Sequence, residues 1–393
     1  MDIKPFRHLR MPQLIFGPEA LASLPKHPLV RQAPVTLLVT GNTSFRSTEK
    51  YGRLVSALGD SHRTVWEVAV GGEPSPELID ALCAQYRDKY VGAVIAIGGG
   101  SVLDTGKALA AMLPVTASVT RYLEGVGTDT HPGYRIPLLA VPTTAGTGSE
   151  ATANAVLSQV GPRGYKRSLR HESFVPDVAL LDPTLTLGCP PEVTAAAGLD
   201  ALTQLLEAYV STKATPLTDA LALEGLRALG GSLMAVCTDE PHSVGRRGQM
   251  AYGAYLSGVV LANAGLGLVH GFAGPIGGLF GVPHGMVCGT LQGEVLRTNL
   301  QLLRETDPQS DALRKYAGAA AVLTGADPQN IPDACDRLLD HIEGWIDRLN
   351  IPRLGAFGLI ESDLDAVVVQ TDCKNNPVGV PEELLMQILR NRL

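Results

Sequence analysis

The sequence predicts an α/β domain, with a parallel sheet layered by helices, followed by an all-helical domain. The chain has 393 residues, which is roughly two to three times the usual size of one domain. Its first half alternates short apolar runs with helical stretches, a pattern typical of a parallel sheet covered by helices. Beyond Pro190 the pattern changes to long Ala/Leu-rich segments at helical spacing, without a convincing strand.

The strands predicted in the first half are short runs rich in Val, Ile, Leu and Thr. They cover residues 35–40, 64–70, 93–98, 137–144 and 178–182. Helices are expected between them at about 48–58, 76–90 and 102–112. Paired prolines in the segment PTLTLGCPP (183–191) end extended structure, and Pro191 suits the first turn of a helix. We therefore expect an α/β domain over residues 1–185 and a helical domain over residues 186–393.

Composition and charge indicate a globular protein with a small-molecule partner. Hydrophobic residues make up 45% and charged residues 18% of the chain, a composition that can bury a core. The net charge of −7 comes without a basic tract, which argues against nucleic acid or an anionic membrane as the main partner. The start of the chain lacks the apolar run of a secretory signal, and the six cysteines include no C-x-x-C pair. We expect a cytoplasmic protein whose thiols are reduced and lie in its core.

One stretch of the second half could be mistaken for a membrane span. Residues 248–293 contain no Asp, Glu, Lys or Arg. They also contain thirteen glycines, two prolines and two histidines, and charge asymmetry does not flank them. Buried helices around a site are therefore the better interpretation.

Two loops rich in glycine and hydroxyl groups follow predicted strands. The segment GGGS (98–101) leads into a helix, where glycines allow close approach and free N–H groups point at an anion. The same residues could form only a tight turn, and they match neither G-x-G-x-x-G nor a P-loop. The segment PTTAGTGSE (142–150) carries four hydroxyls, which suit a ribose and a pyrophosphate. Loops after different parallel strands meet at the carboxyl edge of the sheet, where nucleotides bind.

A possible metal site lies in the second half. Asp200 and Gln204 share one face if GLDALTQLLEAYVS is helical, and His270 and His284 follow in the uncharged stretch. A carboxylate, an amide and two imidazoles suit a divalent metal that polarises an alcohol or carbonyl oxygen. Each residue also has an ordinary explanation, as a solvated or capping group for the first two and as a satisfied core histidine for the others.

Together these motifs resemble the iron-containing (group III) alcohol dehydrogenases, in the superfamily of glycerol dehydrogenase, dehydroquinate synthase and maleylacetate reductase. GGGSVLDTGK, PTTAGTGSE, PDVALLDPTLT, GLDALTQLLEAYVS and VHG…PHG match in order over nearly the whole chain. The resemblance implies a cleft between the two domains that holds a nicotinamide cofactor and usually Fe²⁺. By motif, the cofactor-binding residues would be Gly99, Gly100, Ser101, Thr143, Thr144, Thr147 and Lys166. Asp200, His270 and His284 fall on three of the four metal ligands and are the expected catalytic residues.

The chain departs from the family pattern at two positions of the metal site. Gln204 stands where the family usually has its fourth ligand, a histidine, and Gly274 stands where a further active-site histidine is usual. Gln204 could ligate through its carbonyl oxygen, more weakly than an imidazole. Fe²⁺ is therefore the favoured metal, with Zn²⁺ and no metal as alternatives. Maleylacetate reductases, in the same superfamily, are generally regarded as working without a metal.

A third departure concerns the choice of cofactor. The family's NAD users often have, after the first strand, an Asp that binds the adenine ribose and repels a 2′-phosphate. This chain has Gly41 there, followed by Arg46. Both NAD(H) and NADP(H) are therefore open, and Arg46 is either a phosphate partner or a surface residue.

The reaction implied by the resemblance is reversible hydride transfer between a primary alcohol, or its aldehyde, and the nicotinamide ring. A metal at Asp200, His270 and His284, completed by Gln204, would hold the substrate oxygen; without a metal, either histidine would move the proton through water. Asp104 could position the substrate or only cap its helix. The alternatives are a metal-independent reductase of a carboxylated or phosphonate-bearing carbonyl compound, a lyase of the dehydroquinate synthase type, and a non-catalytic dinucleotide-binding module. We expect a homo-oligomer, specifically a dimer.

Overall fold

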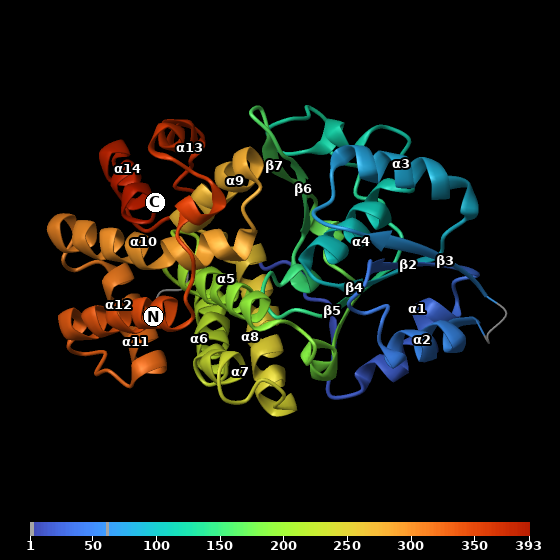
Figure 1. Ribbon diagram of the computed structural model, residues 1–393, viewed down its shortest axis with the longest axis horizontal. Helices are drawn as coiled ribbons and strands as arrows, with labels where there is room; N and C mark the ends of the chain where they lie inside the picture. Colours follow the sequence, from blue (N-terminus) through green and yellow to red (C-terminus); the bar gives the residue numbers. More distant parts are fainter. Residues whose placement is uncertain (1–3, 60–62) are drawn as a thin grey trace.

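A six-stranded parallel sheet forms the centre of the first half. The computed structural model describes residues 4–59 and 63–393, and the strand order is β1-β8-β5-β4-β2-β3. The strands are β1 (Gln13–Phe16), β2 (Val35–Gly41), β3 (Thr64–Val70), β4 (Ala93–Gly98), β5 (Leu138–Pro142) and β8 (Val178–Leu181). An antiparallel pair, β6 (Asn154–Gln159) and β7 (Tyr165–Arg170), lies between the sheet and the helical half (Figure 1).

Helices cover both faces of this sheet. Leu37 and Val39 of β2 pack in one core with α3 (Pro76–Tyr86) and α4 (Gly100–Met112). Leu38 packs in the opposite core with α2 (Glu49–Gly59) and α1 (Pro28–Arg31). Successive side chains of a strand point to opposite faces, so a continuous apolar run is what a doubly covered strand needs. In Figure 1, α1 and α2 lie below the sheet and α3 and α4 above it.

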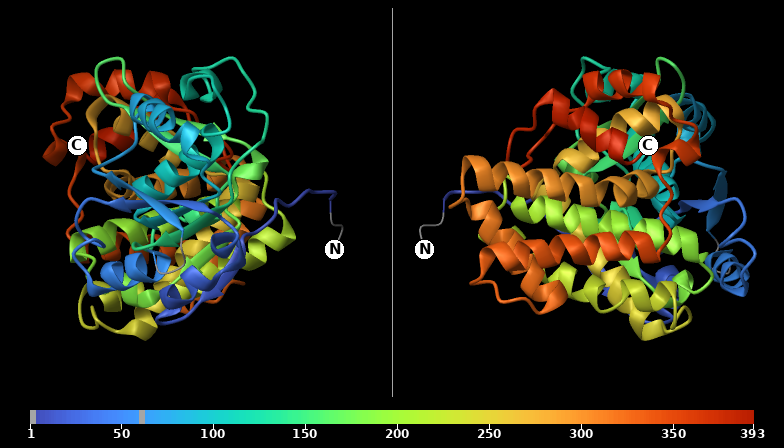
Figure 2. Two further views of the ribbon diagram at one scale, coloured as in Figure 1. Left: turned by 90° about the vertical axis from the view of Figure 1, so that its right-hand side faces the viewer. Right: turned by 60° about the vertical axis from the view of Figure 1, so that its left-hand side comes forward.

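The second half is helical throughout its described length. Its helices are α5 (Pro191–Val210), α6 (Pro216–Gly230), α7 (Leu233–Cys237), α8 (Val244–Ala264), α9 (Leu268–Phe280), α10 (His284–Thr306), α11 (Asp311–Thr324), α12 (Ile331–Arg348), α13 (Leu364–Gln370) and α14 (Glu382–Asn391). One large core contains side chains of α5, α6, α7, α8, α10, α11 and α12. A smaller core contains side chains of α9, α10, α13 and α14. Figure 2 shows the long helices of this half stacked beside one another.

The predicted fold class is confirmed, and the five predicted strands correspond to β2, β3, β4, β5 and β8. Among the strands and α-helices in the described part of the first half, β1, α1, β6 and β7 were missed. β1 has only four residues and exposes Leu14 and Phe16 at the sheet edge, while β7 (YKRSLR) is too basic to look like a buried strand. The division of the chain at residues 185 and 186 stays a prediction.

The charge-free stretch 248–293 forms most of α8, all of α9 and the start of α10. Many of its side chains are buried against neighbouring helices. In the part of the chain that the structure describes, no single helix is long and apolar enough to cross a membrane. Together α8 and α9 would be long and apolar enough, but the chain bends by 99° between them.

Candidate active site

The two glycine- and hydroxyl-rich loops meet at the carboxyl edge of the sheet. β4 and β5 are neighbours, and Thr143 N–H donates to Gly98 O at 2.9 Å. A Cβ added to Gly100 would lie 2.7 Å from Thr147 Cγ2, so the loops are in backbone-to-side-chain contact. This arrangement is the one that the strand pattern indicated.

The first loop places a helix N-terminus at a cavity. Gly99 precedes α4, which begins at Gly100, and the first N–H groups of a helix lack intrahelical partners. Gly100 and Ser101 line the cavity. A side chain at Gly98 would collide with Val102, since its Cβ would lie 2.6 Å from that residue. The loop therefore presents unobstructed backbone donors, which suit a phosphate group.

The glycines of the second loop allow it to pack closely on the helical half. A Cβ on Gly146 would lie 2.7 Å from Ala197 Cβ in α5. Gly148 has a φ of +61°, and its added Cβ would lie 2.5 Å from Gly258 Cα in α8. Here the missing side chains allow the loop to pack directly on the helical half, while the hydroxyl of Thr147 stays at the cavity.

Four potential metal-binding groups converge from three helices of the second half. They are Asp200 (α5), His270 (α9), His284 and Cys288 (both α10), whose donor atoms all lie within 4.8 Å of one another. Asp200 Oδ1 is 3.3 Å from His270 Nε2 and 3.6 Å from His284 Nε2. Cys288 Sγ is 3.7 Å from His270 Nε2 and 3.9 Å from His284 Nε2.

Glu207 fixes the orientation of His270. Its Oε2 accepts from His270 Nδ1–H at 2.7 Å, and its Oε1 accepts from Val269 N–H at 2.6 Å. Since Nδ1 donates to Glu207, Nε2 is the ring atom that faces Asp200 Oδ1 and is free to bind a metal. A carboxylate behind a histidine in this way is the usual support of a metal-binding imidazole.

One unmatched atom of the cluster fits a cation. Asp200 Oδ1 is buried without a hydrogen-bond partner, whereas buried polar atoms are normally paired. Burial alone would raise the pKa of Asp200, but His284 and His270 lower it, so the carboxylate is ionised. Burial lowers the pKa of His284 to about 4, so this imidazole is neutral and can bind a metal.

The groups around His270 stabilise a positive charge on its ring. Burial alone would lower its pKa, but Cys288, Glu207 and Asp200 raise the pKa well above the usual value. The pocket therefore favours a positive charge at His270 Nε2, which a proton or a metal ion can supply. The donor set of one carboxylate, two imidazoles and one thiol suits a divalent transition metal.

The positions that depart from the family pattern lie at the same cavity. Gln204 lines it, with its Oε1 accepting from Ser257 Oγ at 2.6 Å. Gly274 also lines it, and a Cβ added there would have no atom within 4 Å. Cys288 and Glu207 were missed as site residues. Their signals were the four-residue spacing of Cys288 from His284 and the seven-residue spacing of Glu207 from Asp200, each on one helix face.

The remaining cofactor candidates are spread along the sheet edge. Lys166 (β7) lines the cavity and forms an ion pair with Glu73. Gly41 ends β2 near the start of α4, since its added Cβ would lie 3.9 Å from Val102 Cγ2. Five of the predicted site residues do not line this cavity. They are Gly41, Gly99, Thr143, Thr144 and Asp200, the last of which is buried.

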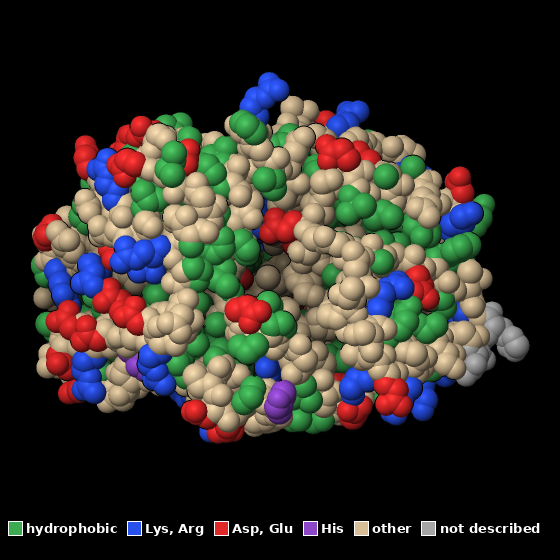
Figure 3. Space-filling model, viewed as in Figure 1, with side chains coloured by type: hydrophobic (Ala, Val, Ile, Leu, Met, Phe, Trp, Pro, Cys, Tyr) green, Lys and Arg blue, Asp and Glu red, His purple; other side chains and the backbone are tan. Residues whose placement is uncertain are grey.

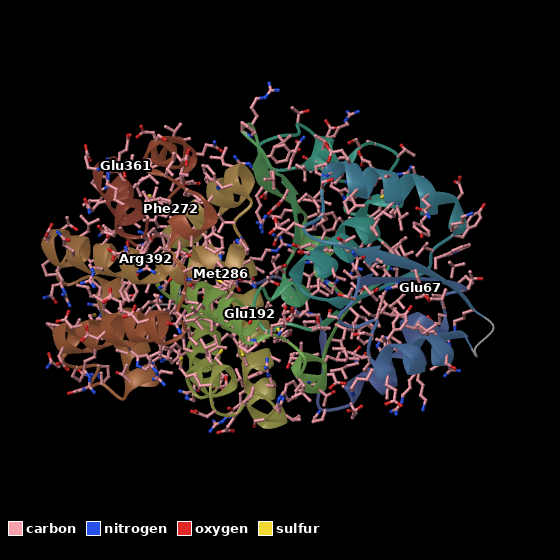
Figure 4. The ribbon with its side chains drawn as sticks, in the orientation of Figure 1. Glu67, Glu192, Phe272, Met286, Glu361 and Arg392 are labelled. Atoms are coloured by element: carbon pink, nitrogen blue, oxygen red, sulfur yellow. The ribbon has the colours of Figure 1, made fainter. Side chains whose placement is uncertain are left out.

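Arg46 and Asp104 are held by protein partners. Arg46 pairs with Glu67 at 2.9 Å and donates to Thr40 Oγ1 at 2.7 Å; Figure 4 labels Glu67 on β3, in the first half. Asp104 accepts from Ser149 Oγ at 2.6 Å and from Val156 N–H at 3.1 Å. It lies in the second turn of α4, so it joins that helix to the second loop and does not cap it.

The cavity combines groups from both halves of the chain. Figure 3 shows the surface hollowed between the halves, and in Figure 4 Met286 and Glu192 mark the starts of α10 and α5 near this region. Lys374, which the sequence reasoning missed, also lines the cavity and donates from Nζ to His270 O at 2.8 Å. A helix N-terminus from the first half thus shares one cavity with the imidazoles of the second.

Two family models match most of the chain. Residues 12–183 match the model described as iron-containing alcohol dehydrogenase. Residues 194–393 match the model described as Fe-containing alcohol dehydrogenase family, C-terminal. The chain belongs to the iron-containing alcohol dehydrogenase family. It is an enzyme of the alcohol dehydrogenase type, in agreement with the sequence analysis.

Individual relatives agree with this family. Long-chain-alcohol dehydrogenase 1 of Geobacillus thermodenitrificans is 36% identical over 75% of this chain and 72% of its own length. The 1,3-propanediol dehydrogenase of Klebsiella pneumoniae is 34% identical over 76% of this chain and 77% of its own.

Solved structures share the whole fold. A 1,3-propanediol oxidoreductase superimposes with a TM-score of 0.86 at 28% identity, covering 99% of this chain and 100% of that one. Sulfoacetaldehyde reductase from Bifidobacterium kashiwanohense, in complex with NAD⁺, has a TM-score of 0.85 at 25% identity, with 99% of each chain covered. These likenesses favour metal-assisted oxidoreduction of alcohols or aldehydes over the metal-independent alternative.

Proposed function

We propose that this member of the family transfers hydride reversibly between a primary alcohol, or its aldehyde, and NAD(P) in the cavity between its two halves. The observation that supports this most is the position of Asp200, His270 and His284 beside the N-terminus of α4. One end of the cavity suits a phosphate group and the other suits a metal and a substrate oxygen. We further propose that residues 1–185 form the cofactor domain and residues 186–393 the metal and substrate domain.

The cofactor would bind along the carboxyl edge of the sheet. Backbone N–H groups of Gly100 and Ser101 at the start of α4 would bind the pyrophosphate, as Gly99 leaves the approach open. Thr147 and the neighbouring Thr143 and Thr144 would bind the rest of the dinucleotide through hydroxyl and backbone groups. Lys166 lines the cavity beside its ion-pair partner Glu73, and its ammonium group would contact the cofactor from there.

The metal would be held by Asp200, His270 and His284. When bound, a divalent metal polarises the substrate oxygen, and the nicotinamide accepts or returns the hydride. Glu207 holds the proton on His270 Nδ1 and keeps Nε2 directed at the cluster. Leu261 and Leu266 line the cavity and supply apolar walls that help to exclude water. Fe²⁺ is the metal that the family name implies.

Cofactor preference depends on the ribose end of the sheet edge. Gly41 offers no carboxylate to repel a 2′-phosphate, which leaves NADPH acceptable. Arg46 is already paired with Glu67, so it provides less attraction for a phosphate than a free arginine would. We therefore propose that the enzyme accepts both cofactors.

The test is an aldehyde panel run with NADH and with NADPH, combined with metal analysis of protein purified without chelator. The proposal predicts aldehyde-dependent oxidation of reduced cofactor that falls after chelation and returns when Fe²⁺ or Zn²⁺ is added. Full activity of metal-free protein would refute the metal-assisted route and favour proton transfer by His270 or His284. Absence of turnover with every alcohol and aldehyde, in metal-loaded protein, would refute the reaction itself.

We also propose that the enzyme is a cytoplasmic homodimer. β1 is an edge strand with one unpaired side, and it exposes Leu14 and Phe16 beside Tyr252. An exposed apolar edge of this kind is usually covered by a partner. Light scattering should give twice the mass of the chain, and a monomer at micromolar concentration would contradict the proposal.

A further inference from the structure

We propose that Cys288 is the fourth ligand of the metal centre, where it replaces the donor that position 204 does not supply. This inference rests on the metal-assisted function proposed above. It assigns to this chain an unusual ligand set of one carboxylate, two imidazoles and one thiolate.

Four of the six distances between the donor atoms are close to those of a tetrahedral metal site. With metal–N and metal–O bonds of about 2.0–2.1 Å and a metal–S bond of about 2.3 Å, tetrahedral angles place N and O about 3.3–3.4 Å apart and S and N about 3.6 Å apart. Asp200 Oδ1 is 3.3 and 3.6 Å from the two imidazole nitrogens. Cys288 Sγ is 3.7 and 3.9 Å from the same nitrogens. Small side-chain adjustments are therefore enough to bring these four atoms around one ion, with a fifth position left for the substrate oxygen.

The position of Cys288 suits a ligand. It follows His284 by four residues on α10, so the two side chains share one face of the helix. Its side chain is fully buried, and its sulfur contacts His270 Nε2 and His284 Nε2. Cys335 is equally buried, but its sulfur contacts the carbonyl oxygen of Leu313 in a helical core. The contacts of Cys288 are thus with metal-binding groups, and those of Cys335 are not.

Gln204 is occupied elsewhere. Its side-chain amide is tied to Ser257 Oγ of α8 at 2.6 Å. Asp200, one turn earlier on α5, keeps Oδ1 without a hydrogen-bond partner. The donors that surround this oxygen are the two imidazoles and the sulfur, so a metal bound to Asp200 would meet Cys288 without displacing any hydrogen bond of Gln204.

A thiolate also changes the charge of the centre. A divalent ion bound by Asp200, the thiolate of Cys288 and two neutral imidazoles carries no net charge, and the thiol proton is released when the metal binds. Asp200, His270 and Cys288 are buried and His284 is partly buried. A thiolate also donates more electron density, so this metal should be a weaker Lewis acid than in relatives with three histidines.

The test is replacement of the native metal by Co²⁺ in the full-length protein, followed by absorption spectroscopy. A thiolate bound to Co²⁺ gives a sulfur-to-metal charge-transfer band in the near ultraviolet, which oxygen and nitrogen ligands do not give. We expect this band in the native protein and in the control variant Cys335→Ser. We expect its loss in Cys288→Ser and Cys288→Ala, together with a fall in metal affinity of about ten- to a hundredfold, as for other losses around metal sites.

A second variant tests the exchange of ligands. Adding Gln204→His to Cys288→Ser should restore metal occupancy after dialysis against a mild chelator, without restoring the charge-transfer band. One Co²⁺ per native chain without the band would overturn the assignment of Cys288 and leave the proposed function intact. Persistence of the band in Cys288→Ser would equally overturn it. Native protein that binds no metal would overturn both this inference and the metal-assisted function. The spectrum of the native protein tests the assignment even if the variants do not fold.

Discussion

Replacing Glu207 by Gln should weaken metal binding although Glu207 does not touch the metal. Glu207 accepts two hydrogen bonds, from Val269 N–H at 2.6 Å and from His270 Nδ1–H at 2.7 Å. An amide has one oxygen and one NH₂ group, so it can accept from only one of these donors. If the oxygen faces Val269, the NH₂ group donates to His270 Nδ1, which favours the tautomer whose proton is on Nε2, where it blocks coordination. If the oxygen faces His270, the buried Val269 N–H loses its acceptor.

The magnitude follows from either orientation. A hydrogen bond to a charged acceptor contributes about 1.5–3 kcal/mol, and Glu207 is buried, so solvent compensates little. At about 1.4 kcal/mol per decade this corresponds to a roughly ten- to hundredfold loss of metal affinity. The turnover number measured at saturating metal should fall less, because the ligand atoms themselves are unchanged.

The assay is competition for the metal between the protein and a chromophoric chelator. The matched control is Asp182→Asn, another buried carboxylate that accepts backbone N–H bonds, from Glu19 and Leu21, far from the cluster. It should lower the free energy of unfolding without changing metal affinity. A Glu207→Gln enzyme with metal affinity within twofold of the native value would refute the argument that Glu207 sets the state of His270.

Three further predictions concern the site and the loop beside it. His284→Ala should lower kcat/KM by at least about a hundredfold while cofactor affinity, measured by fluorescence titration, stays nearly unchanged; near-normal turnover would remove His284 from the site. Gly41→Asp should shift preference toward NADH by on the order of tenfold, because a carboxylate fits there and repels a 2′-phosphate; an unchanged NADPH/NADH ratio would show that residue 41 does not face the ribose. Burial raises the pKa of Glu150 from its ordinary 4.5 to about 7, so the native state binds more protons than the unfolded state between these values. The free energy of unfolding should therefore fall, by up to about 3 kcal/mol, as pH rises through this window, and Glu150→Gln should abolish the fall in denaturant titrations; equal slopes in both proteins would contradict it.

Most of the sheet could be predicted because its strands carry their own signal. β2, β4 and β5 are buried on both faces, so their residues are almost uniformly apolar and stand out from the helices between them. β1 gives no such signal, since an edge strand needs few buried residues. β7 is stabilised by pairing with β6 across the hairpin, and its basic composition does not predict this contact. A strand cannot be predicted from its own residues when it is stabilised mainly by pairing with a neighbouring strand.

The candidate site divides in the same way. The loops after β4 and β5 could be predicted to meet, because strand neighbours fix the positions of the loops that follow them. His270 and His284 stood out in a stretch without charges. Cys288 and Glu207 did not, since a buried cysteine or a helix glutamate has many ordinary explanations. Their roles depend on how α5, α9 and α10 pack against one another, and the spacing of apolar residues along the sequence does not predict this packing.

Small residues join the cofactor end of the site to the metal end. Asp200 is preceded on α5 by alanines, and two of these contact glycines of other segments. A Cβ on Gly146, in the second loop, would lie 2.7 Å from Ala197 Cβ, and one on Gly285, beside His284, would lie 2.6 Å from Ala196 O. The second loop and the start of α10 are therefore joined to α5 by contacts of backbone and methyl groups, which have no rotamers to change. Hydride transfer requires reacting atoms held within a narrow range of distances, and these close contacts help to fix the distance between the loop and the metal ligands.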